Sequence, residues 1–380
     1  MTKRAERLRL LFICLDQSSF VLDDLEMLRE EFEVELFQFD GFKKTGRFNK
    51  ALSLASGFAT QWGWLQREIP EADLVFGWFA DYHMFLPTLL ASRRKTPVAV
   101  MLGGMDCNHL PELNYGVWDS RWRSRLARQI IADADRLIAP DASLLRWSSR
   151  YTSWPDMHED GLETHTSKAV DAEVISPGFE ADAWPLAREE PERRVLSVAY
   201  IKDDRTVRVK GIDLLIEVAR VLPKVDFQVI GVDSAFEPAL RNAYHPPENV
   251  QLQPPRDRAD LSEAYQQASV YAQLSRVESF GMVVGEAMLS GCVPVVSDVG
   301  ALPRLAASAG IVVEQPNAQL IADAIQQALS AGRDQREEGR RHIAKTFSLE
   351  KRRQQLLALL NEMVTGSAAE SDRRGDVLRR

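Results

Sequence analysis

The chain has 380 residues, of which 45% are hydrophobic and 27% are charged, and its formal net charge is -8. This composition is typical of a globular protein of about two domains, and it excludes collagen, a coiled coil and a wholly disordered chain. The negative charge argues against a nucleic-acid-binding protein that relies on bulk positive charge, and three scattered cysteines argue against a disulfide framework or a cysteine zinc site. We therefore expect a reduced, cytoplasmic protein.

The first half of the chain alternates short apolar runs with helical patterns. The first run resembles part of a signal peptide, but it is brief, leads into Asp16 and lacks a small-residue cleavage site, so a buried strand is the better interpretation. No window of the sequence reaches the roughly 18 apolar residues of a membrane span. The predicted strands are Leu10–Leu15, Val34–Phe39, Leu74–Phe79, Val98–Leu102, Arg136–Ala139 and Glu173–Ile175, and the predicted helices are Leu22–Glu31, Phe85–Arg94 and Arg121–Asp133.

The same alternation begins again after residue 194. Continuous apolar strands separated by helices are typical of parallel sheets that are covered on both faces. Two successive series predict an α/β chain with two doubly wound domains rather than one long sheet. The strands predicted here are Val195–Ala199, Asp226–Ile230, Val250–Leu252, Val270–Leu274, Val293–Ser297 and Ile311–Val313, and the helices are Ile212–Leu222, Arg258–Gln267, Met282–Leu289 and Leu320–Leu329.

The charged, proline-containing segment 180–194 predicts a linker or hinge. We expect an N-terminal domain over residues 1–179 and a C-terminal domain over residues 195–341. A helical pattern follows over residues 342–364, and we expect this helix to join the first domain. The small, polar and charged residues 365–380 predict a disordered tail.

The segment 275–305 carries the most informative motif. A predicted strand ends there in a polar loop, and a helix follows directly. Ser279 is a candidate N-cap for that helix, and Gly281 lets the backbone come close to a ligand. The start of the helix offers free N–H groups and the positive end of a dipole, which suit a diphosphate.

Two carboxylates flank this helix start. Glu286 lies about two turns into the helix, where a carboxylate can accept hydrogen bonds from both hydroxyls of a ribose, and Glu278 lies in the loop, towards the other end of the same ligand. The alternative interpretation is a pair of surface carboxylates beside an ordinary strand–helix unit.

The letters ESFGMVVGEAM, followed by GCVPVVS and GALP, resemble the donor-site signature of the retaining glycosyltransferases of family 4. These are the group 1 transferases, whose GT-B fold consists of two facing Rossmann-like domains with a cleft between them. The resemblance implies that Glu286 holds the ribose of a nucleoside-diphosphate sugar and that Glu278 lies near the donor sugar. It also implies that the amides of Phe280, Gly281 and Met282 meet the sugar or the phosphates.

A second match lies between residues 195 and 216, where a strand, a basic loop and the letters KGIDLLI follow one another. In the family that this segment resembles, a lysine and an arginine neutralise the departing diphosphate, because fixed cations stabilise charge that grows on phosphate oxygens. Lys210 is the candidate lysine. The arginine is left open between Arg205 and Arg208, with Arg205 slightly favoured, and the alternative is a solvated basic loop.

The first domain departs from the family pattern. The loop after its first strand contains no glycine, and no histidine stands after the predicted strand Val98–Leu102. That strand is followed by Gly103, Gly104 and a candidate acceptor-side carboxylate, Asp106. His109 and His83 are further candidates to replace the missing histidine. For Asp106 and both histidines an ordinary polar loop residue is an equally good interpretation.

The stretch 121–128 carries several arginines and a tryptophan at helical spacing. It predicts either a weak peripheral contact with a membrane or an anionic acceptor, or simply a solvated helix face.

Taken with the resemblance, the sequence predicts a retaining glycosyltransferase that uses a nucleoside-diphosphate sugar and needs neither a metal nor another cofactor. Its acceptor hydroxyl is left open among a glycan, a lipid-linked sugar and a small molecule, and no nucleic-acid partner is expected. The alternative prediction is a non-catalytic protein of the same fold that binds a nucleotide sugar without transferring it.

Overall fold

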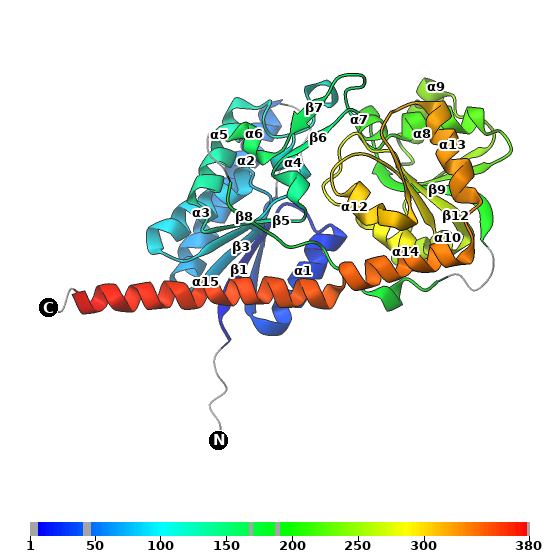
Figure 1. The fold of residues 1–380 in the computed structure, drawn as a ribbon. Coiled ribbons are helices and arrows are strands. Elements are labelled where there is room, and N and C mark those ends of the chain that lie inside the picture. The colour runs from blue at the N-terminus through cyan, green and yellow to red at the C-terminus, as the bar shows by residue number, and fades with distance from the viewer. Residues whose placement is uncertain (1–6, 41–46, 167–169, 187–190, 378–380) are drawn as a thin grey trace.

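Two parallel six-stranded sheets form the framework of the chain. This computed structural model describes residues 7–40, 47–166, 170–186 and 191–377, and it places the two sheets in separate lobes (Figure 1). The strand order is β2-β1-β3-β4-β5-β8 in the first sheet and β11-β10-β9-β12-β13-β14 in the second. The strands are β1 Arg9–Cys14, β2 Glu33–Gln38, β3 Leu74–Trp78, β4 Val98–Met101, β5 Arg136–Ala139, β8 Ala172–Val174, β9 Glu192–Ile201, β10 Asp226–Val232, β11 Val250–Gln253, β12 Ala268–Gln273, β13 Val293–Ser297 and β14 Ile311–Val313.

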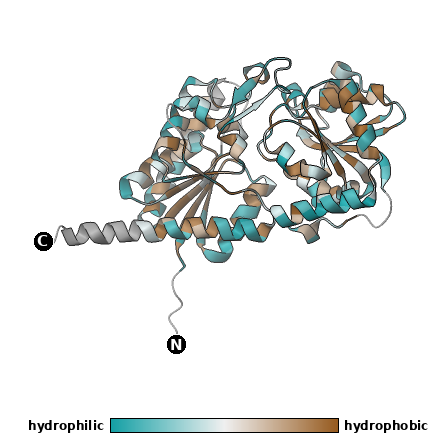
Figure 2. Cartoon of the chain, viewed as in Figure 1, coloured by the Kyte–Doolittle hydropathy of each residue, from teal (hydrophilic) through white to brown (hydrophobic). Residues whose placement is uncertain are grey.

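All twelve strands that the sequence predicts are present, with ends within three residues of the predicted ones. The prediction of two doubly wound α/β domains is confirmed. The signal was strong because most of these strands are buried on both faces, and they appear as brown ribbons inside each lobe (Figure 2). Two short strands were not predicted. They are β6 Trp147–Ser149 and β7 His158–Asp160, which pair as an antiparallel hairpin and lack an apolar run.

The helices that cover the sheets include several that sequence periodicity did not indicate. The segment before Lys210 was predicted to be a polar loop, and this prediction is wrong. It forms the helix α7, because Asp203 caps its start by accepting a 2.8 Å hydrogen bond from the amide of Thr206. The helices are α1 Ser19–Glu31, α2 Arg47–Glu68, α3 Tyr82–Arg94, α4 Gly104–Cys107, α5 Arg121–Asp133, α6 Leu162–His165, α7 Asp204–Val209, α8 Ile212–Val221, α9 Glu237–Tyr244, α10 Arg258–Gln267, α11 Met282–Leu289, α12 Leu302–Ala306, α13 Ala318–Leu329, α14 Arg333–Thr346 and α15 Leu349–Val377.

The C-terminal helices run from the second lobe back beneath the first (Figure 1). The predicted helix 342–364 spans the end of α14 and the beginning of α15. The helical conformation is interrupted at Phe347 and Ser348, where Ser348 forms a β-bridge to Phe179. The apolar side of α15 then packs into the core of the first domain through Leu356 and Leu360.

The predicted tail and linker also differ from the structure. Helix α15 continues to Val377, although a disordered tail was predicted from residue 365, because each residue added to a helix that is already packed gains a hydrogen bond without a new nucleus. Strand β9 begins at Glu192, three residues before the predicted domain start. Residues 187–190 of the predicted linker and 378–380 of the tail lie outside the described residues. Among the described residues, no helix is long and apolar enough to cross a membrane.

Candidate functional site

The carboxyl ends of β9 and β12 meet at the point where the strand order of the second sheet reverses. In open parallel sheets, ligands bind in the crevice outside such a switch point, since the loops there diverge to opposite faces. Strand β9 leads into α7 and then Lys210, and β12 leads into the loop that carries Glu278. The topology therefore brings together the two segments in which the sequence predicted site residues, those that carry Lys210 and Glu278.

Lys210 and Glu278 form an ion pair across this crevice. The Nζ atom of Lys210 lies 2.7 Å from Oε2 of Glu278, and the same oxygen accepts hydrogen bonds from Oγ of Ser275 at 3.2 Å and Nε2 of Gln273 at 3.3 Å. The Glu278 side chain is 10% exposed, whereas that of Lys210 is 31% exposed. The carboxylate is thus held in place, and the ammonium group keeps a solvent-facing side that a ligand can reach.

The two candidate arginines point across to the first domain. Nη1 of Arg205 donates to the carbonyl of Asn114 at 3.3 Å, and Nη1 of Arg208 donates to the carbonyl of Glu112 at 3.4 Å. Both side chains are bonded to one loop of the first domain, and these contacts do not distinguish which arginine assists Lys210.

That loop also supplies a residue that the sequence analysis missed. It spans 110–115 and is closed by hydrogen bonds in both directions between Leu110 and Tyr115, and its apolar side chains pack against Val209 and Val277 of the second domain. Tyr115 lies beside Gly104, where an added Cβ would come within 2.2 Å of the tyrosine oxygen. Burial raises the pKa of Tyr115, and the nearby charge of Glu278 raises it further. No motif in the sequence marks this tyrosine.

The loop before α11 differs in detail from the prediction. The helix is capped by Gly281, not Ser279, because Gly281 adopts a left-handed conformation with φ 96° that favours glycine. The Phe280 ring is buried, 6.3 Å from that of Phe179 and 5.5 Å from that of Phe347. Met282 is the first residue of the helix. The predicted backbone amides thus lie at a helix start whose side chains anchor it in the core.

Glu286 lines a cleft of about 780 Å³ between the domains, with α1 on one side and α11 on the other. Its Oε2 accepts a hydrogen bond from the hydroxyl of Tyr265 at 3.2 Å. Burial raises the pKa of Glu286 to about 7, although the Tyr265 hydrogen bond and the charge of Arg258 oppose the shift. The cleft also contains Asp23 of the first domain, whose charge adds to the increase. A half-buried carboxylate facing a cleft of this size suits the hydroxyl groups of a polar ligand.

Comparison with known proteins finds a family model that matches much of the second half of the chain. Residues 180–346 match the family model described as glycosyl transferases group 1. This part of the chain is therefore similar to the group 1 glycosyl transferases. The match includes both glutamates and Lys210, together with the strand ends that carry them.

The curated relatives agree with this family. The D-inositol 3-phosphate glycosyltransferase of Mycobacterium sp. (strain JLS) is 30% identical over 187 residues, which cover 46% of this chain and 40% of that protein. The enzyme of the same name from Mycobacterium bovis (strain BCG / Pasteur 1173P2) is 27% identical over 269 residues, which cover 65% of this chain and 53% of that protein. The chain thus spans about half the length of these curated relatives.

Solved structures resemble the chain over nearly its whole length. Sucrose-phosphate synthase from Thermosynechococcus elongatus has a TM-score of 0.72 at 16% identity, covering 95% of this chain and 100% of that one. Anabaena HepE in complex with UDP has a TM-score of 0.67 at 15% identity, covering 93% of this chain and 100% of that one. These likenesses concern the fold, and they confirm the two-domain GT-B architecture that the sequence predicts.

The acceptor-side candidates in the first domain occupy two kinds of position. Asp106 is buried in the turn after β4, where its carboxylate accepts hydrogen bonds from the amides of Ala80 at 2.7 Å and Gly103 at 2.8 Å, and burial raises its pKa to about 7. The His83 ring is also fully buried, with Nε2 2.8 Å from the carbonyl oxygen of Trp78, and burial lowers its pKa to about 4. Both side chains hold local backbone and do not face solvent.

The other candidates of the first domain lie nearer the second domain or the surface. An added Cβ on Gly104 would lie 3.7 Å from Cβ of Ser279, so Gly104 lies close to the loop of Glu278. An added Cβ on Gly103 would instead meet the Phe79 ring at 2.1 Å. Nε2 of His109 lies 2.6 Å from a carboxylate oxygen of Asp119 on a partly exposed surface.

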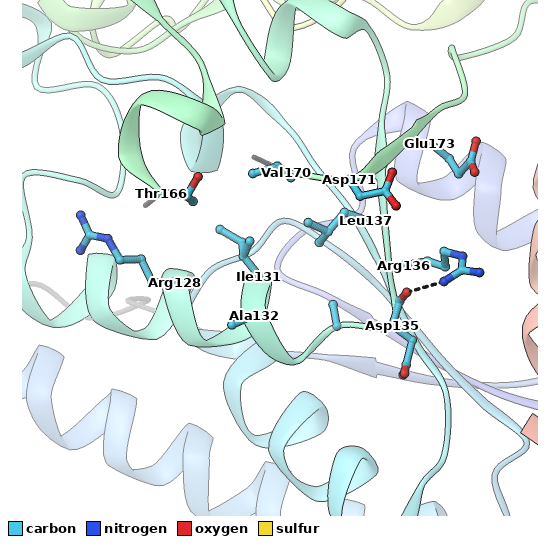
Figure 3. A pocket seen from close by; sticks show the side chains of 11 residues that line it. Arg128, Ile131, Ala132, Asp135, Arg136, Leu137, Thr166, Val170, Asp171 and Glu173 are labelled. Atoms are coloured by element: carbon cyan, nitrogen blue, oxygen red, sulfur yellow. Dashed lines mark hydrogen bonds between the residues drawn. The ribbon is translucent and has the colours of Figure 1, made fainter. Parts of the chain in front are cut away.

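Two arginines of the basic stretch 121–128 contact other side chains of the first domain. Arg123 forms a bidentate ion pair with Asp81, the N-cap of α3, and the Arg128 guanidinium lies 5.2 Å from the centre of the Trp118 ring. A second cavity of about 550 Å³ adjoins Arg128 (Figure 3). None of the candidate site residues lines that cavity. Among the described residues, no group of three or more His, Cys, Asp or Glu side chains could hold a metal ion.

The raised pKa of Glu286 predicts a stability effect that depends on pH. The pKa is about 7 in the folded protein and 4.5 in the reference state, so the folded protein retains a proton that the unfolded chain loses between these pH values. The contribution of this carboxyl group to the unfolding free energy is fully present below about pH 4.5, and it is lost as the pH rises from there through about 7. We expect the unfolding free energy of the wild type, relative to that of Glu286→Gln, to fall by about 3 kcal/mol between about pH 4.5 and about pH 8. Urea titrations of both proteins at each pH measure this difference, and a difference that does not change with pH would contradict it.

Proposed function

We propose that the chain is a retaining, metal-independent glycosyltransferase that moves a sugar from a nucleoside-diphosphate sugar to an acceptor hydroxyl. The observation that carries the proposal is the position of the Lys210–Glu278 pair at the switch point of a group 1 domain, with Glu286 lining the adjoining cleft. Anabaena HepE, which shares the fold, has been solved with UDP and with UDP-glucose, so a uridine nucleotide is the first ligand to test.

In this proposal the two domains contribute different groups to one transfer step. The bond between the anomeric carbon and the diphosphate breaks, the acceptor oxygen forms a bond to that carbon on the same face, and the acceptor proton passes to a diphosphate oxygen. Lys210, with Arg205 or Arg208, stabilises the charge that grows on the diphosphate, and this electrostatic contribution needs no metal. Glu278 orients the sugar, Glu286 holds the ribose, and the acceptor enters beside Gly103 and Gly104.

The test is a transfer assay with UDP-glucose and a panel of sugar, polyol and lipid-linked acceptors. NMR of the product's anomeric proton is expected to show the α configuration of the donor, both with and without EDTA. A β-linked product would contradict retention, and loss of the reaction in EDTA would contradict metal independence. If the protein binds the nucleotide sugar but transfers the sugar neither to an acceptor nor to water, so that no UDP is released, this result would favour the non-catalytic alternative.

Replacement of Glu286 is expected to weaken nucleotide binding. A hydrogen bond to an ionised group contributes about 1.5–3 kcal/mol, so Glu286→Ala should raise the Kd for UDP roughly 10- to 100-fold. Calorimetric titration measures this change. Glu263→Gln on the neighbouring helix α10 is the matched control, because its carboxylate is exposed and accepts a hydrogen bond from Nε2 of Gln267 at 2.9 Å. Equal Kd values for wild type and Glu286→Ala would remove Glu286 from the binding site.

A further inference from the structure

The β6–β7 hairpin of the first domain crosses to the donor side of the molecule, beside α7 (Figure 1). Its base is fixed in the first domain. Nε1 of Trp147 donates to Oδ1 of Asn108 at 2.7 Å, and the buried carboxylate of Asp160 accepts from the amide of His109 at 2.6 Å and lies 2.8 Å from the ring nitrogen of His165. The hairpin is therefore anchored on the same loop that follows the glycine pair.

The far end of the hairpin is buried in the other domain. Tyr151 has no exposed surface, and its ring belongs to the apolar core of the second domain. Its hydroxyl donates to the carbonyl of Leu274 at 3.3 Å, and Oγ1 of Thr152 donates to the carbonyl of Arg276 at 2.7 Å. Two adjacent hairpin residues thus bond to two carbonyls of the segment that leads directly to Glu278.

The same segment also supports Lys210. The amide of Arg276 donates to the carbonyl of Val209 at 2.9 Å, and its guanidinium forms a bidentate pair with Asp213, with distances of 2.9 and 2.8 Å. An added Cβ on Gly211 would lie 2.0 Å from the carbonyl oxygen of Leu274. The segment after Lys210 therefore contacts the segment before Glu278 at the same carbonyl group that accepts from the Tyr151 hydroxyl. A shift of residues 274–276 would therefore move Glu278 relative to Lys210.

We propose that Tyr151 and Thr152 are positioning residues, through which a hairpin of the first domain holds the loop that carries Glu278 in its place against Lys210. The catalytic consequence rests on the proposed function, but the structural one does not. Neither residue contacts the ion pair itself; each acts through the main chain of residues 274–276. The two domains are thereby coupled at the active loop as well as through the C-terminal helix.

The test uses the full chain with Tyr151→Phe and Thr152→Val, alone and combined. Both changes keep the shape of the side chain and remove only the hydroxyl donor. Ser148→Ala is the control, because Ser148 lies on the same hairpin and is exposed. Without nucleotide, the backbone amides of residues 274–280 are expected to exchange about tenfold faster in the double variant than in the wild type. This factor corresponds to the net free energy of about one hydrogen bond. Unchanged exchange there would overturn the proposal, whether or not the protein is a transferase.

The kinetic arm separates positioning from binding. In the double variant, kcat for sugar transfer from UDP-glucose is expected to fall about tenfold, while the Kd for UDP stays within about twofold of wild type. Ser148→Ala should change neither value. If faster exchange is accompanied by an unchanged kcat, or by a Kd that rises as much as kcat falls, the hairpin does not position the catalytic pair.

Discussion

Replacement of Lys210 by methionine is expected to lower kcat for sugar transfer about 10²–10³-fold, the range seen when one group that stabilises transition-state charge is removed. Methionine keeps most of the length of the side chain and removes the charge. The ammonium group of Lys210 is held 2.7 Å from Glu278, so it is a fixed cation rather than a mobile surface one. A fixed cation costs no reorganisation when charge develops on the leaving diphosphate, and for this reason the loss should appear in kcat more than in KM.

Two further variants show whether charge stabilisation is the cause. Lys202→Met removes an exposed lysine from the same strand–helix connection, where the ammonium lies 5.9 Å from the centre of the Tyr200 ring, and it should leave kcat unchanged. Lys210→Met also leaves Glu278 without its partner, so Lys210→Met/Glu278→Gln tests whether the lost activity comes only from that unpaired carboxylate. Recovery of wild-type kcat in the double variant, or less than about a threefold loss in Lys210→Met, would contradict the role given to Lys210.

Removal of the guanidinium of Arg352 is expected to destabilise the first domain by about 3–5 kcal/mol, the usual cost of leaving one member of a buried ion pair alone. Arg352 is 4% exposed and Asp24 is 1% exposed. Nε and Nη2 of the arginine lie 2.8 and 2.6 Å from the two carboxylate oxygens, Nη1 donates to the carbonyl of Ile175, and Asp24 also accepts from Nε1 of Trp78 at 3.1 Å. This cluster fastens helix α15 to α1 and the first sheet.

Urea unfolding followed by tryptophan fluorescence measures the effect. All eight tryptophans lie between Trp62 and Trp184, so the signal reports chiefly on the first domain. Arg353→Ala is the matched control, because Arg353 is the adjacent residue of α15 and pairs with Glu30 and Glu31 at the surface, where ion pairs contribute little. Arg352→Met should shift the midpoint strongly and Arg353→Ala should not. Equal midpoints for Arg352→Met and wild type would show that α15 is not fastened through this pair.

The sequence predicted the strands well because buried parallel strands are continuous apolar runs. It also predicted that Glu278 lies in the loop after a strand and Glu286 on the helix that follows, since both fall within a recognisable motif. The prediction of Ser279 as helix cap was wrong, because side-chain chemistry alone does not show that a following glycine adopts a left-handed conformation.

Contacts between the two domains could not be predicted in this way. Tyr115 and Tyr151 lie in loops without periodicity. Tyr115 packs in a cluster with Val209 and Val277 of the second domain, and Tyr151 donates to the carbonyl of Leu274 of that domain. The helix α7 was missed because one capping side chain, Asp203, decides between helix and loop over six residues. Local patterns therefore predicted the segments that carry Lys210, Glu278 and Glu286, while the contacts between the two domains emerged only from the tertiary structure.

The most direct test of the central claim is a thermal-unfolding panel of wild type and Glu286→Ala with UDP, GDP, ADP and the matching sugar nucleotides. A ligand present at about 100 times its Kd stabilises the folded state by about 2.7 kcal/mol, which is a shift of several degrees. We predict that nucleotides of one base raise the Tm of the wild type in this way and raise that of Glu286→Ala by about half as much or less. If no nucleotide shifts the wild type at millimolar concentration, the cleft beside Glu286 is not a nucleotide-sugar site and the proposed function is wrong.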